Sequence, residues 1–182
     1  MPRAGFRRWP RTSWEKSNWP GACCNSSRGR DSDAENRFRR ALAAVEGSQS
    51  LIESYTLSDL GLVDLRRFRY DEALYWFERA SVLSRRSQMP PPLEIALINL
   101  GATYMNLGDF ERAVKNLNDA LALAEQQHER VYQMPALVLL GETWSLAGDL
   151  AKAAECYQKA RGLGDPRSDK EWLSNVLDDC RR

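Results

Sequence analysis

Features that mark many enzymes are scarce in this chain of 182 residues. Its only histidine, His128, ends a polar run at residues 125–129 that is typical of a solvated helix end. A Ser-His-Asp or Cys-His catalytic system needs its histidine beside a nucleophile, and a zinc site needs more ligands than Cys156, Cys180 and His128 obviously supply. The sequence therefore predicts a protein that is not an enzyme and that has no catalytic, metal or cofactor site.

Long apolar runs are also lacking. The longest, residues 136–140, falls far short of the roughly 20 residues that a transmembrane helix needs. Residues 1–20 contain no apolar stretch of the kind found in secretory signals. Four cysteines without paired spacing are typical of a reducing compartment: Cys23, Cys24, Cys156 and Cys180. We therefore expect a cytoplasmic protein without a transmembrane segment.

The chain instead carries a motif with a period of 40 residues, which places Gly61, Gly101 and Gly141 in phase. The motif reads Leu-Gly, an aromatic residue three positions later, Gly, and then Ala-x-x-x-(aromatic or Leu)-x-x-Ala. Its best copy is Leu100, Gly101, Tyr104, Gly108, Ala113, Leu117 and Ala120. A fixed period of this length indicates an array of stacked units rather than one globular core.

Each unit is predicted to be a helix, a tight turn and a second helix. Apolar residues recur at helical spacing on both sides of Gly108. Asp109 and Asp149 follow the turn glycines, where a side-chain oxygen caps the next helix. The small residues of the motif allow the paired helices to approach closely, and the aromatic residues fill the space beside them.

This pattern resembles the tetratricopeptide repeat family over residues 48–164. The resemblance implies an all-α fold, a right-handed superhelical solenoid of stacked helix pairs. The family's common period is 34 residues, so the longer period here adds about 9 Å of helix to each pair at 1.5 Å per residue. The first copy departs from the motif, because Asp64 replaces the aromatic residue and Phe68 replaces the turn glycine. We therefore expect a less regular turn in that copy.

The period divides the chain into six segments. Residues 1–30 form a basic, tryptophan-containing segment that we expect to be disordered, and residues 31–47 form a half-repeat that contains a second helix only. Repeats one, two and three occupy residues 48–88, 89–128 and 129–164. Residues 165–182 are predicted to form a capping helix. The alternative, the first helix of an unfinished fourth repeat, is disfavoured because the expected Leu-Gly falls on Cys180 and Arg181. Helix starts are expected near Pro91 or Pro92 and close to Met134, or else a kink at Pro135.

Charge is unevenly distributed, with a net charge of +6 in residues 1–30 and −5 in the remainder. Basic residues interleaved with tryptophans can bind nucleic acid or an anionic membrane surface. A tail without function is the interpretation that we favour, because no nucleic-acid-binding fold accompanies the segment. An arginine-rich start also occurs in mitochondrial transit peptides, but three prolines oppose the amphipathic helix that such a peptide needs.

The resemblance implies that the first helix of each pair lines a concave groove in which a partner binds. The predicted groove residues are Tyr55, Ser58, Leu62, Arg66, Asn99, Ala102, Met105, Asn106, Val138, Glu142 and Ser145. Asn99 resembles a residue that grips a peptide backbone, although a role in bridging neighbouring helices is equally compatible with its position. Leu62, Ala102 and Glu142 depart from the basic clamp of the family members that bind C-terminal carboxylates, so we expect an extended segment or an amphipathic helix instead.

The predicted function is that of a non-catalytic scaffold or adaptor that binds a peptide or helix of a partner protein. The alternative is a regulatory fragment of a larger signalling protein or enzyme whose catalytic part is absent. Self-association through the ends of the array is a further expectation, because cut arrays expose apolar faces. Leu42, Val45, Trp172 and Leu177 are the residues predicted to form those faces.

Overall fold

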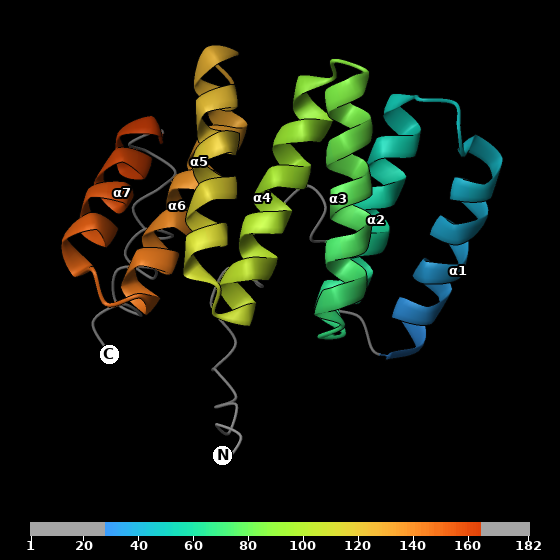
Figure 1. Ribbon diagram of the computed structural model, residues 1–182, viewed down its shortest axis with the longest axis horizontal. Coiled ribbons are helices and arrows are strands. Elements are labelled where there is room, and N and C mark those ends of the chain that lie inside the picture. Colours follow the sequence, from blue (N-terminus) through green and yellow to red (C-terminus); the bar gives the residue numbers. More distant parts are fainter. Residues whose placement is uncertain (1–27, 165–182) are drawn as a thin grey trace.

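The computed structural model describes residues 28–164, and within them it contains seven α-helices and no strand (Figure 1). The basic segment before residue 28 and the predicted capping helix at residues 165–182 lie outside the described residues. The helices are α1 (Arg28–Val45), α2 (Leu51–Arg66), α3 (Tyr70–Arg86), α4 (Pro90–Leu107), α5 (Phe110–Gln126), α6 (Arg130–Leu146) and α7 (Leu150–Leu163).

The helices form a row of consecutive pairs. α2 packs against α3, α4 against α5 and α6 against α7, and each pair contacts the next through α3 with α4 and α5 with α6. α1 adds to the row by packing against α2. The three pairs fall within the predicted repeats, so the all-α repeat array expected from the sequence is confirmed. α1 starts at Arg28, which places residues 28–30 in the helix rather than in the basic segment.

The in-phase glycines are the points of closest approach within each pair. A Cβ atom added at Gly141 would lie 2.6 Å from Cε1 of Tyr157, and one added at Gly101 would lie 2.5 Å from Cγ of Leu117. Gly61 faces the ring of Phe77 in the same way. Since real Cβ atoms essentially never come this close to another heavy atom, any larger residue at these positions would force the facing side chain or its helix to shift. The large facing side chains are fully or almost fully buried as a result.

The turn inside each pair has the same hydrogen bonds in all three repeats, so the expectation of a less regular turn in repeat one is wrong. Backbone N–H groups at Arg69, Asp109 and Asp149 donate to the carbonyl five residues earlier, at 2.9 Å in each case. What differs is the residue at the left-handed position. Gly108 and Gly148 have φ of 77° and 88°, whereas Phe68 adopts φ of 61°. The first turn therefore follows the same path at a steric cost.

Repeats two and three continue each turn with a capped helix. The carboxylates of Asp109 and Asp149 accept hydrogen bonds from the backbone N–H groups three residues later, at 3.1 Å, as the sequence predicted. The residue that supplies this N–H also places its cation over the aromatic ring of the first helix: Arg112 lies 4.7 Å from the centroid of Tyr104. Such contacts tie the start of the second helix to the end of the first.

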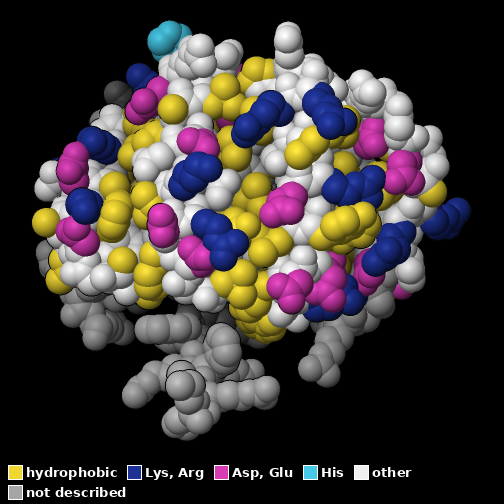
Figure 2. All heavy atoms as spheres, in the orientation of Figure 1, with side chains coloured by type: hydrophobic (Ala, Val, Ile, Leu, Met, Phe, Trp, Pro, Cys, Tyr) yellow, Lys and Arg dark blue, Asp and Glu magenta, His cyan; other side chains and the backbone are white. Residues whose placement is uncertain are grey.

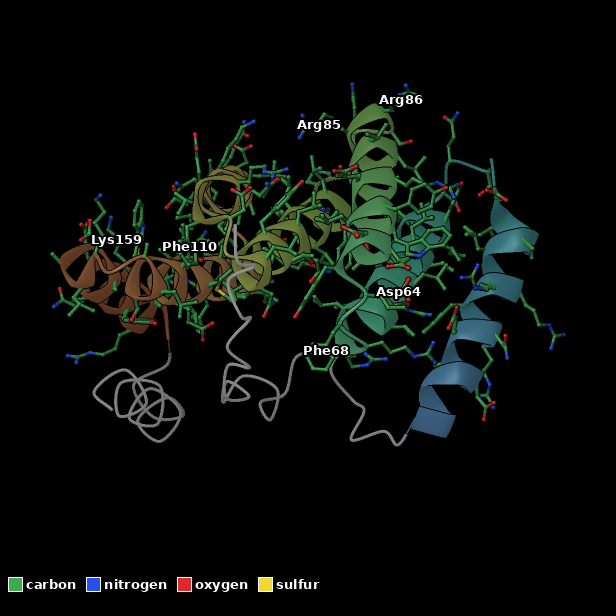
Figure 3. The ribbon with its side chains drawn as sticks, turned by 60° about the horizontal axis from the view of Figure 1, so that its bottom comes forward. Asp64, Phe68, Arg85, Arg86, Phe110 and Lys159 are labelled. Atoms are coloured by element: carbon green, nitrogen blue, oxygen red, sulfur yellow. The ribbon has the colours of Figure 1, made fainter. Side chains whose placement is uncertain are left out.

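Repeat one replaces this arrangement with an ion-paired network that attaches α1. Asp64 is buried at the aromatic position, where it accepts a hydrogen bond of 3.0 Å from Nε1 of Trp76 and pairs with Arg69. Arg69 and Arg67 both bind the carboxylate of Glu35 on α1. Figure 3 shows Asp64 between α2 and α3. It shows Phe68 at one end of this helix pair and Arg85 and Arg86 at the other end. The residues that depart from the repeat motif are therefore those that join the half-repeat to the array.

The half-repeat exposes part of the helix face that a partner helix covers elsewhere. Ala34 and Phe38 are half-buried and Ala41 is exposed, whereas their counterparts Ala73 and Phe77 in α3 are fully buried. Within residues 28–164 no first helix covers this face of α1. Leu42, by contrast, is buried against α2 and is not available for self-association, which corrects that expectation.

The prolines affect two helix starts differently. α4 begins at Pro90, so the expected start near Pro91 or Pro92 is one residue late. α6 begins at Arg130 and continues through Pro135, which corrects the expected start near Met134. Proline at the sixth helical residue removes one backbone hydrogen bond close to the helix N-terminus, where the helix tolerates the loss better than at its centre.

Candidate partner-binding face

The first helices of the three repeats lie side by side, because α2 contacts α4 and α4 contacts α6. In the view of Figure 1, the second helices α3 and α5 lie in front of α2 and α6. The surface on that side carries acidic and basic side chains closely intermixed with apolar ones (Figure 2). We call the opposite side, formed by α2, α4 and α6, the first-helix face.

The structure divides the eleven predicted groove residues by exposure. Three are exposed and three are half-buried, and these six can meet a partner. The exposed residues are Tyr55, Arg66 and Asn106, and the half-buried ones are Leu62, Glu142 and Ser145. The remaining five are buried: Ser58, Asn99, Ala102, Met105 and Val138. Their burial depends on how the helices pack against one another, which the sequence does not reveal.

Several of these residues have structural contacts. Ala102 and Met105 belong to the largest apolar cluster, and Val138 packs in the cluster of repeat three. The Ser58 hydroxyl donates to the Ser54 carbonyl at 3.2 Å, and Asn106 donates to the Ala102 carbonyl at 2.8 Å. Asn99 is 5% exposed, and its side-chain NH2 group donates to no residue within 28–164. No hydrogen bond of the Asn99 NH2 group to the described residues therefore supports either predicted role, gripping a peptide backbone or bridging neighbouring helices.

Large apolar side chains are exposed in the N-terminal turns of both α2 and α6. Ile52 and Val131 are each 63% exposed, and Tyr55 is 37% exposed. Leu51 and Val131 are two periods apart and occupy the same place in their repeats. The sequence analysis did not identify Ile52 and Val131, although the extra helical turn implied by the 40-residue period was the signal that could have revealed them.

Titratable groups from three helices meet in the same region. Burial raises the pKa of Tyr132 on α6, and the nearby Tyr55, Glu94 and Glu129 raise it further. The groups that act on Tyr132 belong to α2, to α4 and to the residue before α6. Glu94, Glu129 and Tyr132 are also residues that sequence reasoning missed, because the predicted groove on α4 and α6 began several residues later.

Two carboxyl groups on the first helices are desolvated and accept no hydrogen bond at one or both of their oxygens from the described residues. Burial and the charge of Glu129 raise the pKa of Glu94 to about 7. Burial alone raises the pKa of Glu142 to about 7. Burial also raises the pKa of Asp59 on α2, although Arg66 counteracts part of the shift. All three groups would gain free energy from a nearby positive charge.

Within residues 28–164 no group of three or more His, Cys, Asp or Glu side chains could hold a metal ion. His128 is exposed and follows α5 with φ of 58°, at the helix end that the sequence predicted. In the same part of the chain, no helix combines the length and the apolar character needed to cross a membrane.

Comparison with known proteins agrees with the architecture. Residues 93–163 match one family model described as tetratricopeptide repeat, and residues 55–87 match a second model with the same description. The chain belongs to the tetratricopeptide repeat family. The resemblance derived from the in-phase glycines is thereby confirmed.

Similar proteins include a subunit of a large assembly. A segment of 62 residues of this tetratricopeptide repeat chain is 40% identical to the BBSome complex member BBS4 of Bos taurus, and the match covers 34% of this chain and 11% of that protein. The chain thus spans about a tenth of the length of this relative.

Solved structures share the fold at lower identity. BtubC (BKLC) from P. vanneervenii superposes with a TM-score of 0.68 at 22% identity, over 74% of this chain and 57% of that chain. A putative kinesin light chain from Podospora anserina with nearly identical TPR-like repeats gives a TM-score of 0.64 at 13% identity, over 84% of this chain and 86% of that chain. These likenesses show the stacked helical fold alone.

Proposed function

We propose that this chain is a non-catalytic interaction module that binds a segment of a partner protein on its first-helix face. Tetratricopeptide repeats are generally protein-interaction modules. The observation that carries the proposal is the exposure of Ile52, Tyr55 and Val131 in the N-terminal turns of the first helices α2 and α6. Large apolar side chains left exposed at one end of the first helices gain free energy when a partner covers them.

The geometry favours an elongated ligand. The face runs across three parallel first helices, so an extended segment or an amphipathic helix contacts several repeats at once. BBS4, which matches part of this chain, is described as a member of a complex, and a role in assembly is the corresponding proposal here. We place binding in the cytoplasm, as expected from the cysteine usage. The alternative of a regulatory fragment remains a prediction that no structural observation favours.

The test compares two pairs of matched variants of the full chain. The first pair, Ile52→Arg and Val131→Arg, places charges on the first-helix face. The second pair, Val82→Arg and Leu150→Arg, places the same charges at similarly exposed apolar positions of the second helices. Each immobilised variant is used to capture proteins from a cell extract, after circular dichroism has verified that it melts like the unmodified chain.

We expect the first pair to lose the captured proteins and the second pair to retain them, because a desolvated charge opposes apolar contact. Equal capture by both pairs, or loss only with the second pair, would contradict binding on the first-helix face.

A further inference from the structure

A second-helix contact surface on α1 has no first helix against it within residues 28–164. In the three complete pairs, the residues of the pattern Ala-x-x-x-(aromatic or Leu)-x-x-Ala are at most 4% exposed. In α1 the same pattern consists of Ala34 and Phe38, which are half-buried, and Ala41, which is exposed. We call these three residues the α1 stripe. A surface hollow of about 490 Å³ adjoins the stripe and is lined by Asp33, Ala34, Arg37 and Phe38.

A neighbouring side of α1 fixes the helix to repeat one. Leu42 is 6% exposed and packs in an apolar cluster with Trp76. Glu35 binds Arg67 and Arg69 at the turn between α2 and α3. These contacts hold the α1 stripe in place, so a helix that docks on it meets a preorganised surface and loses less free energy on ordering.

Residues 1–27 precede α1, but their sequence matches the α1 stripe poorly. They contain five basic residues and one acidic residue, and like charge opposes their approach to the exposed Arg37 and Arg40. Pro20 interrupts any helix that would run alongside α1. Their large apolar residues do not recur every three or four positions, as one face of a helix requires. These residues are Phe6, Trp9, Trp14 and Trp19.

Residues 168–180 match the α1 stripe in pattern, size and charge. Their apolar residues recur at helical spacing, which is the pattern of an amphipathic helix. Large side chains suit a stripe that consists mainly of alanine and adjoins a hollow. The segment also carries four acidic residues and one basic residue, which complements the exposed Arg37 and Arg40. Its apolar residues are Trp172, Leu173, Val176, Leu177 and Cys180.

A segment that starts at Ser168 reaches the α1 stripe only in another copy of the chain. α1 and α7 lie at opposite ends of the row (Figure 1). Four successive helix contacts separate them: α1 with α2, α2 with α4, α4 with α6, and α6 with α7. Packed helices lie about 8–10 Å apart, whereas residues 164–168 span at most about 14 Å when fully extended. The segment therefore cannot lie against α1 of its own copy.

We infer that residues 168–180 of one copy of this chain pack as an amphipathic helix on the α1 stripe of a second copy. Trp172 and Leu177 fill the hollow beside Phe38, and acidic residues of the segment face Arg37. Because the two surfaces lie at opposite ends of the array, the interface is head-to-tail, and the copies form an open chain or a closed ring. The α1 stripe does not belong to α2, α4 or α6, so the inference goes beyond the proposed function.

The test is sedimentation velocity of the full chain in reducing buffer, over concentrations from micromolar to millimolar. Ala41→Glu places a charge on the α1 stripe. Its matched control, Ala43→Glu, changes another exposed alanine, two residues and therefore about 200° further around the helix. Leu177→Glu places a charge among the apolar residues of the segment, and Asn175→Glu is its control. Circular dichroism verifies that each variant melts like the unmodified chain.

We expect the unmodified chain and both controls to associate reversibly as the concentration rises. Ala41→Glu and Leu177→Glu should each raise the dissociation constant about tenfold or more, because the interface must desolvate a carboxylate. A mixture of these two variants should form a dimer and no larger species, because each retains the surface that the other has lost. Absence of association at every concentration, or equal effects of a variant and its control, would overturn the inference.

Other occupants of the α1 stripe give different results. If Ala41→Glu abolishes association and Leu177→Glu does not, a second copy covers the stripe with another segment and the inference fails. It also fails if the chain is a monomer in which amide hydrogens of residues 1–27 exchange as slowly as those of α2, because the chain's own basic segment then covers the stripe. Neither result involves Ile52 or Val131, so the capture experiment decides the proposed function independently.

Discussion

The same glycine-to-alanine substitution should have opposite effects at two positions of repeat three. At Gly141 a new Cβ atom would lie 2.6, 2.7 and 2.8 Å from three ring atoms of the buried Tyr157. Contacts between carbon atoms are optimal at about 3.5–4.0 Å, so the ring or the helix must retreat by about 1 Å. At Gly162, in the last turn of α7, a new Cβ atom meets nothing within 4 Å.

The expected magnitude follows from two opposing terms. Replacing glycine by alanine in a helix interior gains up to about 1 kcal/mol in helix propensity. Overpacking a filled core costs about 1–3 kcal/mol. Gly141→Ala should therefore destabilise the chain by about 1 kcal/mol, whereas Gly162→Ala, which carries no packing cost, should stabilise it by a few tenths to about 1 kcal/mol.

Urea denaturation at 25 °C, followed by circular dichroism at 222 nm, measures both effects as shifts of the midpoint. The predicted order of midpoints is Gly162→Ala, then the unmodified chain, then Gly141→Ala. If Gly141→Ala raises the midpoint as much as Gly162→Ala does, the close approach of α6 and α7 at Tyr157 is not what requires glycine, and the packing explanation of the in-phase glycines fails.

Three further substitutions test the electrostatics and the turn. Burial raises the pKa of Glu94 from 4.5 to about 7, so its contribution to stability is present below pH 4.5 and is lost as the pH rises through 7, by up to about 3 kcal/mol. Glu94→Gln should therefore be more stable than the unmodified chain at pH 8. In thermal melts recorded from pH 4.5 to 8, the variant should lack this pH dependence. Glu35→Ala should cost about 1–3 kcal/mol, because Arg67 and Arg69 lose their shared carboxylate. It should speed hydrogen exchange in α1 more than replacement of the exposed Asp33 by alanine does; equal exchange would refute the ion-paired attachment. Phe68→Gly should raise the thermal midpoint, because it removes about 1 kcal/mol of left-handed strain from a side chain that is 67% exposed; a lowered midpoint would mean that the Phe68 ring contributes more than its backbone costs.

The sequence predicted the helix pairs because close approach requires a particular residue type at a fixed spacing. Gly101 and Gly141 locate the contact, and Asp109 and Asp149 locate the helix starts, so the pairing follows from local chemistry. The turn at Phe68 was predicted less well. A non-glycine residue there suggested a different path, but the packing of α2 against α3 imposes the left-handed conformation in spite of its cost.

The candidate site was less predictable, because its exposure depends on contacts between repeats. Met105 and Val138 have the spacing of groove residues, yet both are buried in apolar clusters formed with other helices. The attachment of Glu35 to Arg67 and Arg69 depends on the register of α1 against α2, which no local pattern encodes.

The most direct test of partner binding on the first-helix face is a nuclear magnetic resonance titration of the full chain with ring-labelled tyrosines. Tyr55 and Tyr132 belong to the proposed site, whereas Tyr75 is an exposed tyrosine on α3 and serves as an internal control. On addition of a purified protein that the unmodified chain captures and the Ile52→Arg and Val131→Arg variants do not, the ring signals of Tyr55 and Tyr132 should shift together with one dissociation constant, and those of Tyr75 should stay in place. Shifts at Tyr75 without shifts at Tyr55 and Tyr132 would contradict binding on this face.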